Sequence, residues 1–278
     1  MRRGWVVNAL LALAVSALGL FVAYRPGSDA PTAHRLSRLE ATSAQRIALE
    51  RKGDPRVVIE RRRGGWYITA PLEARADPFQ VERLLAILEA TARHRLPVHD
   101  LARYELEAPL TRLAIDGESF SFGAVNSVTR EQYVLAGETV YAVSPRYGAM
   151  IPTNLSQLVG KQLFAEGEVP VRLEFRDFTV ARESDGWRVS PAREHMSQDD
   201  VQRWLDAWRH ASALRAEASS GDKPSETIRI ALENGKRVQI DVVQTAPELV
   251  LARSDEKIRY HFPAQTAKRL LASPAAHP

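Results

Sequence analysis

The hydrophobic pattern of this chain repeats about 120 residues along the sequence. Two matching apolar sets carry the repeat: Val81, Leu84, Leu85 and Leu88 in the first half, and Val201, Trp204, Leu205 and Trp208 in the second. Spacings of three, four and seven residues mark one face of an amphipathic helix. Self-similarity at a fixed period is the signature of a repeated structural unit. The pattern therefore predicts two copies of one unit, each containing such a helix.

Short segments of alternating apolar and polar residues surround each predicted helix. They are residues 46–50, 56–60, 66–69, 113–122, 133–135 and 140–143 in the first copy, and 171–175, 178–189, 228–242, 249–252 and 258–262 in the second. Gly64-Gly65, Asp116-Gly117 and Asn234-Gly235 interrupt these segments, and such pairs favour hairpin turns. Many strands with one substantial helix per copy are typical of an antiparallel α+β fold. We expect two tandem copies of an antiparallel-sheet-plus-helix unit.

Each helix also has a start signal. Asp77 resembles an N-cap followed by Pro78 at the first helical position, a combination that supplies an acceptor for free backbone N–H groups. In the second copy, Ser197 and Asp200 have the spacing of a capping box. We expect the first helix to continue through Ala92 and the second to reach about residue 214.

The N-terminal segment is the strongest local signal. Arg2 and Arg3 precede a stretch from Trp5 to Tyr24 that contains no charged residue. About 20 apolar residues in a helix span a bilayer core, and basic residues stay on the cytoplasmic side. We expect an uncleaved N-terminal transmembrane helix, with everything after Tyr24 outside the cytoplasm. The alternative is a cleaved signal peptide ending near Ala30, which Pro31 directly after the cut would oppose.

These signals divide the chain into five parts. They are a cytoplasmic tip and transmembrane anchor (1–24), a tether (25–44), a first α+β repeat (45–165), a second α+β repeat (166–272) and a frayed tail (273–278). The expected location is the cell inner membrane, with a single span and a periplasmic C-terminal domain. The lipid bilayer is then the first partner.

Composition narrows the function without naming one. The 278 residues are 45% hydrophobic and 26% charged, with a formal net charge of +4, so no strong basic excess points to nucleic acid as a partner. Cysteine is absent. Disulfides, a thiol nucleophile and thiolate metal ligation are therefore excluded.

A family resemblance rests on several short motifs in residues 45–165. The segment Leu101-Ala102-Arg103-Tyr104-Glu105-Leu106-Glu107-Ala108-Pro109 resembles the Tyr-Gly-Leu-x-x-Pro segment of an uncharacterised bacterial domain family of unknown function. The tryptophan-containing hairpin before Pro71 and the helix start at Asp77 match as well. Genes of that family accompany gliding-motility-type ABC transporters, so the resemblance implies a membrane-anchored, extracytoplasmic protein associated with transporter subunits. Glu105 stands where the family has Gly, which predicts a different turn.

Candidate chemistry is sparse. His94 and His99-Asp100 permit a metal site, but a helix C-terminus also explains a histidine, and we favour that structural interpretation. His195 and His261 have no recognisable partner motif. Asp199 and Asp200 fall in a helix's first turn, where the dipole accounts for acidic residues. Glu105 and Glu107 are a second acidic pair without a supporting motif.

Two surface features suggest binding. Arg61-Arg62-Arg63 is the densest basic run, either a solvated hairpin or a contact for an acidic polymer or lipid headgroups. The tryptophans at 66, 187, 204 and 208 could line a groove, but their periodic spacing favours core.

The sequence therefore predicts a non-enzymatic, membrane-anchored periplasmic accessory or scaffold protein of an ABC-type transport system, without a cofactor or metal. The alternative function is a periplasmic binding module for a glycan or other envelope polymer.

Overall fold

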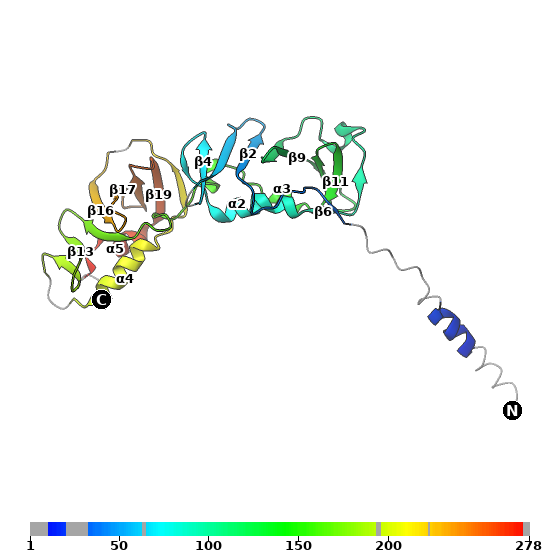
Figure 1. Ribbon diagram of the computed structural model, residues 1–278. Helices are drawn as coiled ribbons and strands as arrows, with labels where there is room; N and C mark the ends of the chain where they lie inside the picture. The colour runs from blue at the N-terminus through cyan, green and yellow to red at the C-terminus, as the bar shows by residue number, and fades with distance from the viewer. Residues whose placement is uncertain (1–10, 21–32, 63–64, 193–195, 222, 275–278) are drawn as a thin grey trace, which may run out of the picture.

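The computed structural model describes residues 11–20, 33–62, 65–192, 196–221 and 223–274. Antiparallel sheet dominates these residues, with a few helices packed against it. Two large sheets follow one another along the long direction of the molecule (Figure 1). The expected antiparallel sheets, accompanied by a few helices, are confirmed.

The first sheet has nine strands in the order β5-β4-β3-β2-β8-β9-β10-β11-β7. Their bounds are β2 (Arg46–Arg51), β3 (Val57–Arg62), β4 (Gly65–Ala70), β5 (Ala74–Arg75), β7 (Arg95–Leu96), β8 (Thr111–Ile115), β9 (Glu118–Val125), β10 (Gln132–Ala136) and β11 (Thr139–Val143).

The second sheet has eight strands in the order β14-β13-β12-β16-β17-β18-β19-β15. Their bounds are β12 (Pro170–Glu174), β13 (Thr179–Glu183), β14 (Gly186–Ser190), β15 (Arg215–Ala218), β16 (Glu226–Leu232), β17 (Arg237–Gln244), β18 (Glu248–Arg253) and β19 (Ile258–Pro263). Taken in chain order, the strands of the two sheets occupy matching places, and β5 is an additional edge strand of the first sheet.

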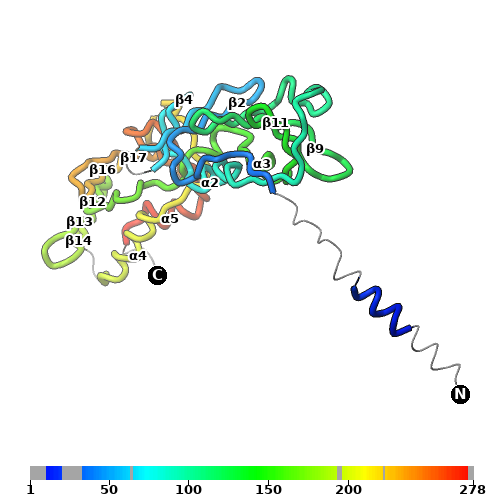
Figure 2. The backbone as a smooth tube through the Cα atoms, turned by 45° about the vertical axis from the view of Figure 1, so that its right-hand side comes forward, coloured from blue at the N-terminus to red at the C-terminus, as the bar shows by residue number. Residues whose placement is uncertain are grey.

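Residues from the repeated motifs fall in matching elements. Trp66 and Trp187 are the second residues of β4 and β14. Leu84 and Trp204 are the seventh residues of helices α2 (Pro78–Leu85) and α4 (Gln198–Arg209). Two further helices, α3 (Arg146–Ala149) and α5 (Ala264–Leu271), follow the last long strand of each sheet. Figure 2 shows α2 and α3 along the first sheet, and α4 beside α5 on the second.

Both predicted helix caps are present. The Asp77 carboxylate accepts hydrogen bonds from the backbone N–H groups of Phe79 and Gln80, at 3.0 and 3.2 Å. Ser197 and Asp200 form the reciprocal capping box at the start of α4. These bonds satisfy donors that a helix leaves free in its first turn.

The expected length of the first helix is wrong. Helix α2 ends at Leu85 and continues only as a 3-10 turn, η1 (Ala86–Glu89). The chain then becomes extended because β6 (Thr91–Ala92) pairs with β1 (His34–Arg35) and β7 pairs with β11. Tertiary pairing overrides the local helical pattern, and His94 consequently does not lie at a helix end. Helix α4 likewise ends at Arg209, before residue 214.

The bulkier stripe of α4 packs on an aromatic layer. Trp204 and Trp208 are buried, and their indole N–H groups donate to the carbonyl oxygens of Ala272 and Leu270 at 2.9 Å. The stacked rings of Phe175 and Phe178 lie next to Trp204. The core interpretation therefore holds for these two tryptophans. Trp66 and Trp187 are only partly buried.

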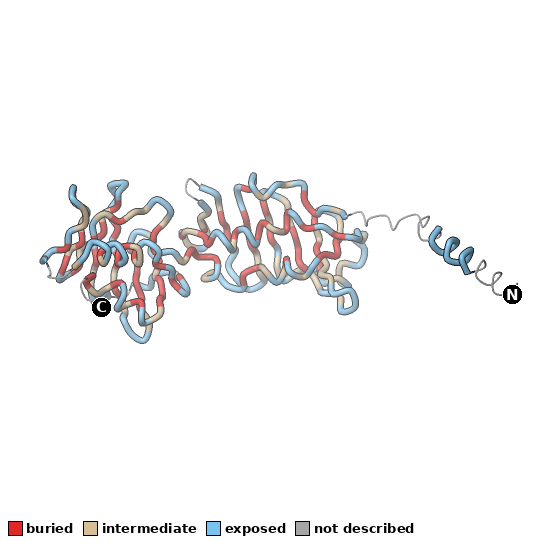
Figure 3. The backbone as a smooth tube through the Cα atoms, turned by 90° about the horizontal axis from the view of Figure 1, so that it is seen from below, coloured by how far each residue is buried: buried red, intermediate tan, exposed pale blue. Residues whose placement is uncertain are grey.

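Parts of the expected tether and tail are ordered structure. Within residues 25–44, strand β1 pairs with β6 and Leu36 is buried against the first sheet. At the other end, Ser273 is buried, while residues 275–278 lie outside the described residues. Figure 3 shows buried positions running through both sheets.

Glu105 is in the left-handed conformation, with φ of 56°, at the end of the 3-10 turn η2 (Leu101–Tyr104). That conformation is the one glycine adopts most easily. The structure therefore places a glutamate in a backbone conformation that favours glycine.

Residues 11–20 are helical, whereas the two ends of the predicted membrane span, 5–10 and 21–24, lie outside the described residues. Over the described ranges, no helix combines the length and the apolar character needed to cross a membrane.

Candidate functional site at the junction of the two sheets

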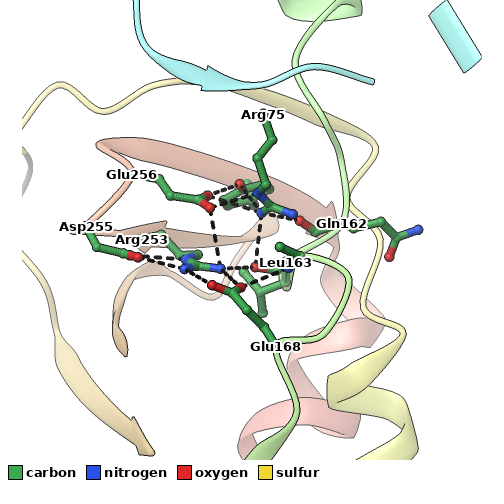
Figure 4. Close-up of polar contacts among 9 residues, drawn as sticks. Arg75, Gln162, Leu163, Glu168, Arg253, Asp255 and Glu256 are labelled. Atoms are coloured by element: carbon green, nitrogen blue, oxygen red, sulfur yellow. Dashed lines mark hydrogen bonds and ion pairs between the residues drawn. The ribbon is translucent and has the colours of Figure 1, made fainter. Parts of the chain in front are cut away.

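Arg75, at the edge of the first sheet, crosses to the second domain. Its guanidinium donates to both carboxylate oxygens of Glu256, at 2.8 and 3.1 Å, and to the hydroxyl oxygen of Tyr260 at 2.9 Å. The same group donates to the carbonyl oxygens of Gln162 and Leu163 in the connecting segment. One side chain therefore joins both sheets and the segment between them (Figure 4).

A second arginine fixes that connecting segment to the second sheet. Arg253 ends β18, and its side chain is 1% exposed. It donates to the Leu163 carbonyl at 2.9 Å and pairs with Glu168 at 2.7 Å and with Asp255 at 2.7 Å. Glu256 also lies 3.5 Å from it. Two guanidinium groups and three carboxylates thus form one continuous network, which we call the junction network.

Burial and charge oppose each other in the junction network. Desolvation alone would raise the pKa of Glu168, but hydrogen bonds from Arg253 and from the Ala165 N–H outweigh it and hold the pKa below its ordinary value. Burial would lower the pKa of Arg253, yet its carboxylate partners raise it. Burial raises the pKa of Tyr260, so its hydroxyl stays protonated and donates to Glu256 at 2.6 Å. These charges stabilise one another in place.

Two clefts flank Arg75. One, of about 510 Å³, is lined by Trp66, Phe79 and residues of the connecting segment, and we call it the aromatic cleft. The other, of about 660 Å³, lies between the Arg62–Glu73 region and the turn that carries Glu256. Ligand sites concentrate at domain boundaries and have volumes of about 300–1,000 Å³. The junction therefore offers both an ion-paired joint and space for a ligand.

The predicted basic run lies near this junction. Arg61 donates to the Thr42 carbonyl at 2.7 Å, and Arg62 pairs with Glu73 at 2.7 Å. Each guanidinium also lies over an aromatic ring of β4, 5.8 and 5.6 Å from the ring centroid. Arg63 lies outside the described residues. Arg61 and Arg62 are exposed but already have local partners.

The other candidate residues from the sequence do not come together in one site. His94, His99 and Asp100 are exposed in the segment after β6, and His195 lies outside the described residues. Among described side chains, no group of three or more histidines and acids is arranged to hold a metal ion. Asp200 serves the α4 cap, as expected, and Glu105 and Glu107 are exposed.

His261, for which the sequence indicates no partner, contacts two carboxylates in the structure. It is 5% exposed, with Nδ1 2.8 Å from Glu248 and Nε2 3.0 Å from Glu217. Arg215 also contacts Glu248 at 2.8 Å. These groups tie edge strand β15 to β19 and β18.

Sequence reasoning missed the residues of the junction network. Arg75 and Glu256 are 181 residues apart, and Arg253 and Glu168 are 85 apart. An arginine is normally exposed, and no local pattern distinguishes these two from the others. Two acidic residues, Asp255 and Glu256, follow Arg253 closely in the sequence. Acidic residues are also common in exposed turns, so this pair does not by itself indicate a buried ion-pair network.

The fold and junction define a protein of two antiparallel sheets joined through a buried ion-pair network. A family model described as a domain of unknown function, DUF4340, matches residues 66–226, more than half of the 278-residue chain. The chain belongs to this family, which confirms the expected membership of an uncharacterised domain family. The match runs from β4 to β16 and so includes Arg75 and Glu168 of the junction network, whereas Arg253, Asp255 and Glu256 lie beyond it. No curated protein and no solved structure matches the chain.

Proposed function

We propose that this protein is a non-enzymatic scaffold, anchored in the inner membrane, whose two-sheet body acts in the periplasm as an accessory of an ABC-type transport system. The observation that carries the scaffold role is the junction network. Arg75 is 13% exposed and Glu256 16% exposed in their ion pair, so separating the sheets would leave desolvated charges unpaired. A joint of this kind holds two binding faces at a fixed spacing.

The membrane part of the proposal is supported by the sequence. The charge-free stretch from Trp5 to Tyr24 follows two arginines, and such a pattern directs the following chain across the membrane. A reporter that is active only in the periplasm, fused after Pro278, should be active. The mature chain should retain its first residues, and a mature N-terminus near Pro31 would contradict an anchor.

The transporter part is supported by the family resemblance in residues 45–165. Full-length protein, purified from membranes in mild detergent, should bring with it an ATPase and its membrane-spanning subunit, both identified by mass spectrometry. Arg75→Met should reduce their recovery because the joint loosens. Arg203→Met, on an exposed pair in α4, is the matched control. Recovery of the chain alone, with or without prior cross-linking, would contradict the proposal.

The internal repeat supports the same role. The matching strand orders make the body two variants of one unit, which we propose arose by duplication. Two related units held at one joint suit an accessory that contacts two components.

The second candidate function is a periplasmic binding module for a glycan or other envelope polymer. The aromatic cleft favours it because a concave surface with partly exposed rings is what such a module needs.

A further inference from the structure

Comparison of the two repeats singles out Phe79. It is the second residue of α2, and the matching residue of α4 is Asp199. An acidic residue in the first turn interacts favourably with the helix dipole, which phenylalanine cannot do. Phe79 is 73% exposed, so it gains little from burial either. Neither helix stability nor core packing accounts for this ring.

The first residue of each helix also differs between the repeats, being Pro78 in α2 and Gln198 in α4. In α4 the side-chain amide of Gln198 accepts from the Trp187 N–H at 3.1 Å and donates to the Trp187 carbonyl at 2.9 Å. In α2 the matching residue is Pro78, which has no such group. The Trp66 carbonyl accepts instead from Ala76. The first repeat therefore has no side chain in the place that Gln198 fills.

The glycines before the two tryptophans show the resulting space. Gly65 and Gly186 have nearly the same φ, 131° and 128°. A Cβ atom at Gly186 would lie 3.1 Å from the Gln198 amide, whereas at Gly65 it would meet no described atom within 4 Å. The space that Gln198 fills beside Trp187 in the second repeat is thus open beside Trp66 in the first. It forms part of the aromatic cleft, which Trp66 and Phe79 line.

The lining of the aromatic cleft selects for a flat ligand. Its apolar part consists of rings, from Trp66, Tyr67, Pro78, Phe79 and Phe164, together with alanines, and it contains no Leu, Ile, Val or Met. By contrast, a smaller cavity of about 200 Å³ on the first domain is lined by Leu49, Val57, Leu155 and Leu158 among others. Aliphatic pockets suit branched apolar groups, whereas exposed aromatic faces stack on the C–H faces of sugar rings.

The polar lining matches a neutral ligand. Arg75 is neutralised by Glu256, and the Asp77 carboxylate accepts from the α2 backbone. Of the charged side chains that remain, Lys161 is positive and Glu166 negative, and neither has an ion-pair partner within the described chain. Gln162 and Ser212 add neutral groups, and Figure 4 shows the Gln162 side chain pointing away from the junction network. These groups can donate to and accept from hydroxyls.

We propose that the aromatic cleft is a binding site for neutral glycan chains, in which pyranose rings stack on Trp66 and Phe79. Lys161, Gln162, Glu166 and Ser212 hydrogen-bond their hydroxyls. The site lies beside Arg75, so its shape depends on the junction that also fixes the two sheets. This binding is separate from the scaffold role, and each can hold without the other.

Calorimetric titration of the full-length protein in mild detergent tests the site. The probes are chitohexaose, cellohexaose and maltohexaose, with the anionic hexagalacturonate for comparison. At least one neutral oligosaccharide should bind with one site per chain, and hexagalacturonate should bind at least tenfold more weakly. Failure of all three neutral probes to bind, or preference for the anionic one, would overturn the proposal.

Variants distinguish the cleft from the rest of the surface. Phe79→Ala and Trp66→Ala should each weaken binding at least tenfold, while Trp66→Phe, which keeps a ring, should retain most of it. Trp187→Ala is the matched control in the other repeat and should leave affinity unchanged. Because Phe79 is 73% exposed, its variant should keep the wild-type melting temperature.

Unchanged affinity in Phe79→Ala would place the saccharide elsewhere and refute the assignment. If no saccharide binds and Phe79→Ala instead reduces the recovery of transporter subunits, the cleft docks a protein and the glycan proposal is wrong.

Discussion

Replacement of Arg253 by methionine removes the most buried charge of the junction network while keeping an unbranched apolar side chain. The arginine makes hydrogen bonds to Leu163, Glu168 and Asp255. The Asp255 side chain is 44% exposed, so its carboxylate can be solvated by water, whereas the Glu168 side chain is only 12% exposed. Leaving a buried carboxylate without its partner costs about 3–5 kcal/mol. We expect Arg253→Met to lower the stability of the body by that amount.

The assay is thermal unfolding of the full-length protein in mild detergent, followed by near-ultraviolet circular dichroism. For a body of this size, 1 kcal/mol corresponds to about 2–4 °C in Tm, so the predicted loss is roughly 6–20 °C. Arg203→Met is the control, because the Arg203 side chain is 75% exposed in its pair with Asp200. An exposed pair contributes about 0–1 kcal/mol, and Tm should hardly move.

A double variant separates lost charge pairing from lost packing. Glu168→Gln in the Arg253→Met background removes the stranded carboxylate, so it should recover part of the loss, with a coupling of roughly 0.5–3 kcal/mol. If Arg253→Met behaves like Arg203→Met, or if Glu168→Gln gives no recovery, the network does not stabilise the junction as we describe.

Three further predictions follow from the same structure. Trp204→Ala should cost about 3–5 kcal/mol because it empties a buried site, whereas the exposed Arg62→Ala should leave Tm nearly unchanged; equal effects in thermal unfolding would contradict the core assignment. The pKa of Glu168 in the folded protein is lowered below its ordinary value, so its contribution to stability is present above that ordinary value and is lost as the pH falls through the folded-state pKa. Tm should therefore drop in acid more steeply for wild type than for Glu168→Gln, and parallel curves would argue against this. Glu105→Gly should raise stability by up to about 1 kcal/mol because it relieves a left-handed φ of 56°; a lower denaturation midpoint would contradict that reasoning.

Local patterns predicted most of the regular structure because those patterns have local causes. Asp116-Gly117 forms the β8–β9 turn with positive φ at both residues, as the pair favours. The caps at Asp77 and Ser197 need only neighbouring backbone groups. The matching apolar faces of the two predicted helices indicated an internal repeat, and the matching strand orders of the two sheets agree with it.

Features set by distant parts of the chain could not be predicted in this way. The first helix stops early because Ala92 pairs with His34, a partner that helical periodicity cannot indicate. The junction network depends on residues far apart in sequence. The exposure of Phe79 beside the aromatic cleft likewise depends on how distant segments pack, which the residues around it do not indicate.

The rigidity of the junction can be measured directly because the chain contains no cysteine. Val128→Cys on the first domain and Lys236→Cys on the second introduce two exposed sites for spin labels. Double electron–electron resonance then reports the distribution of distances between the domains. We predict one narrow distribution for the labelled protein and a broad one when Arg75→Met is added. A distribution that is equally broad with Arg75 intact would contradict a body locked at this junction.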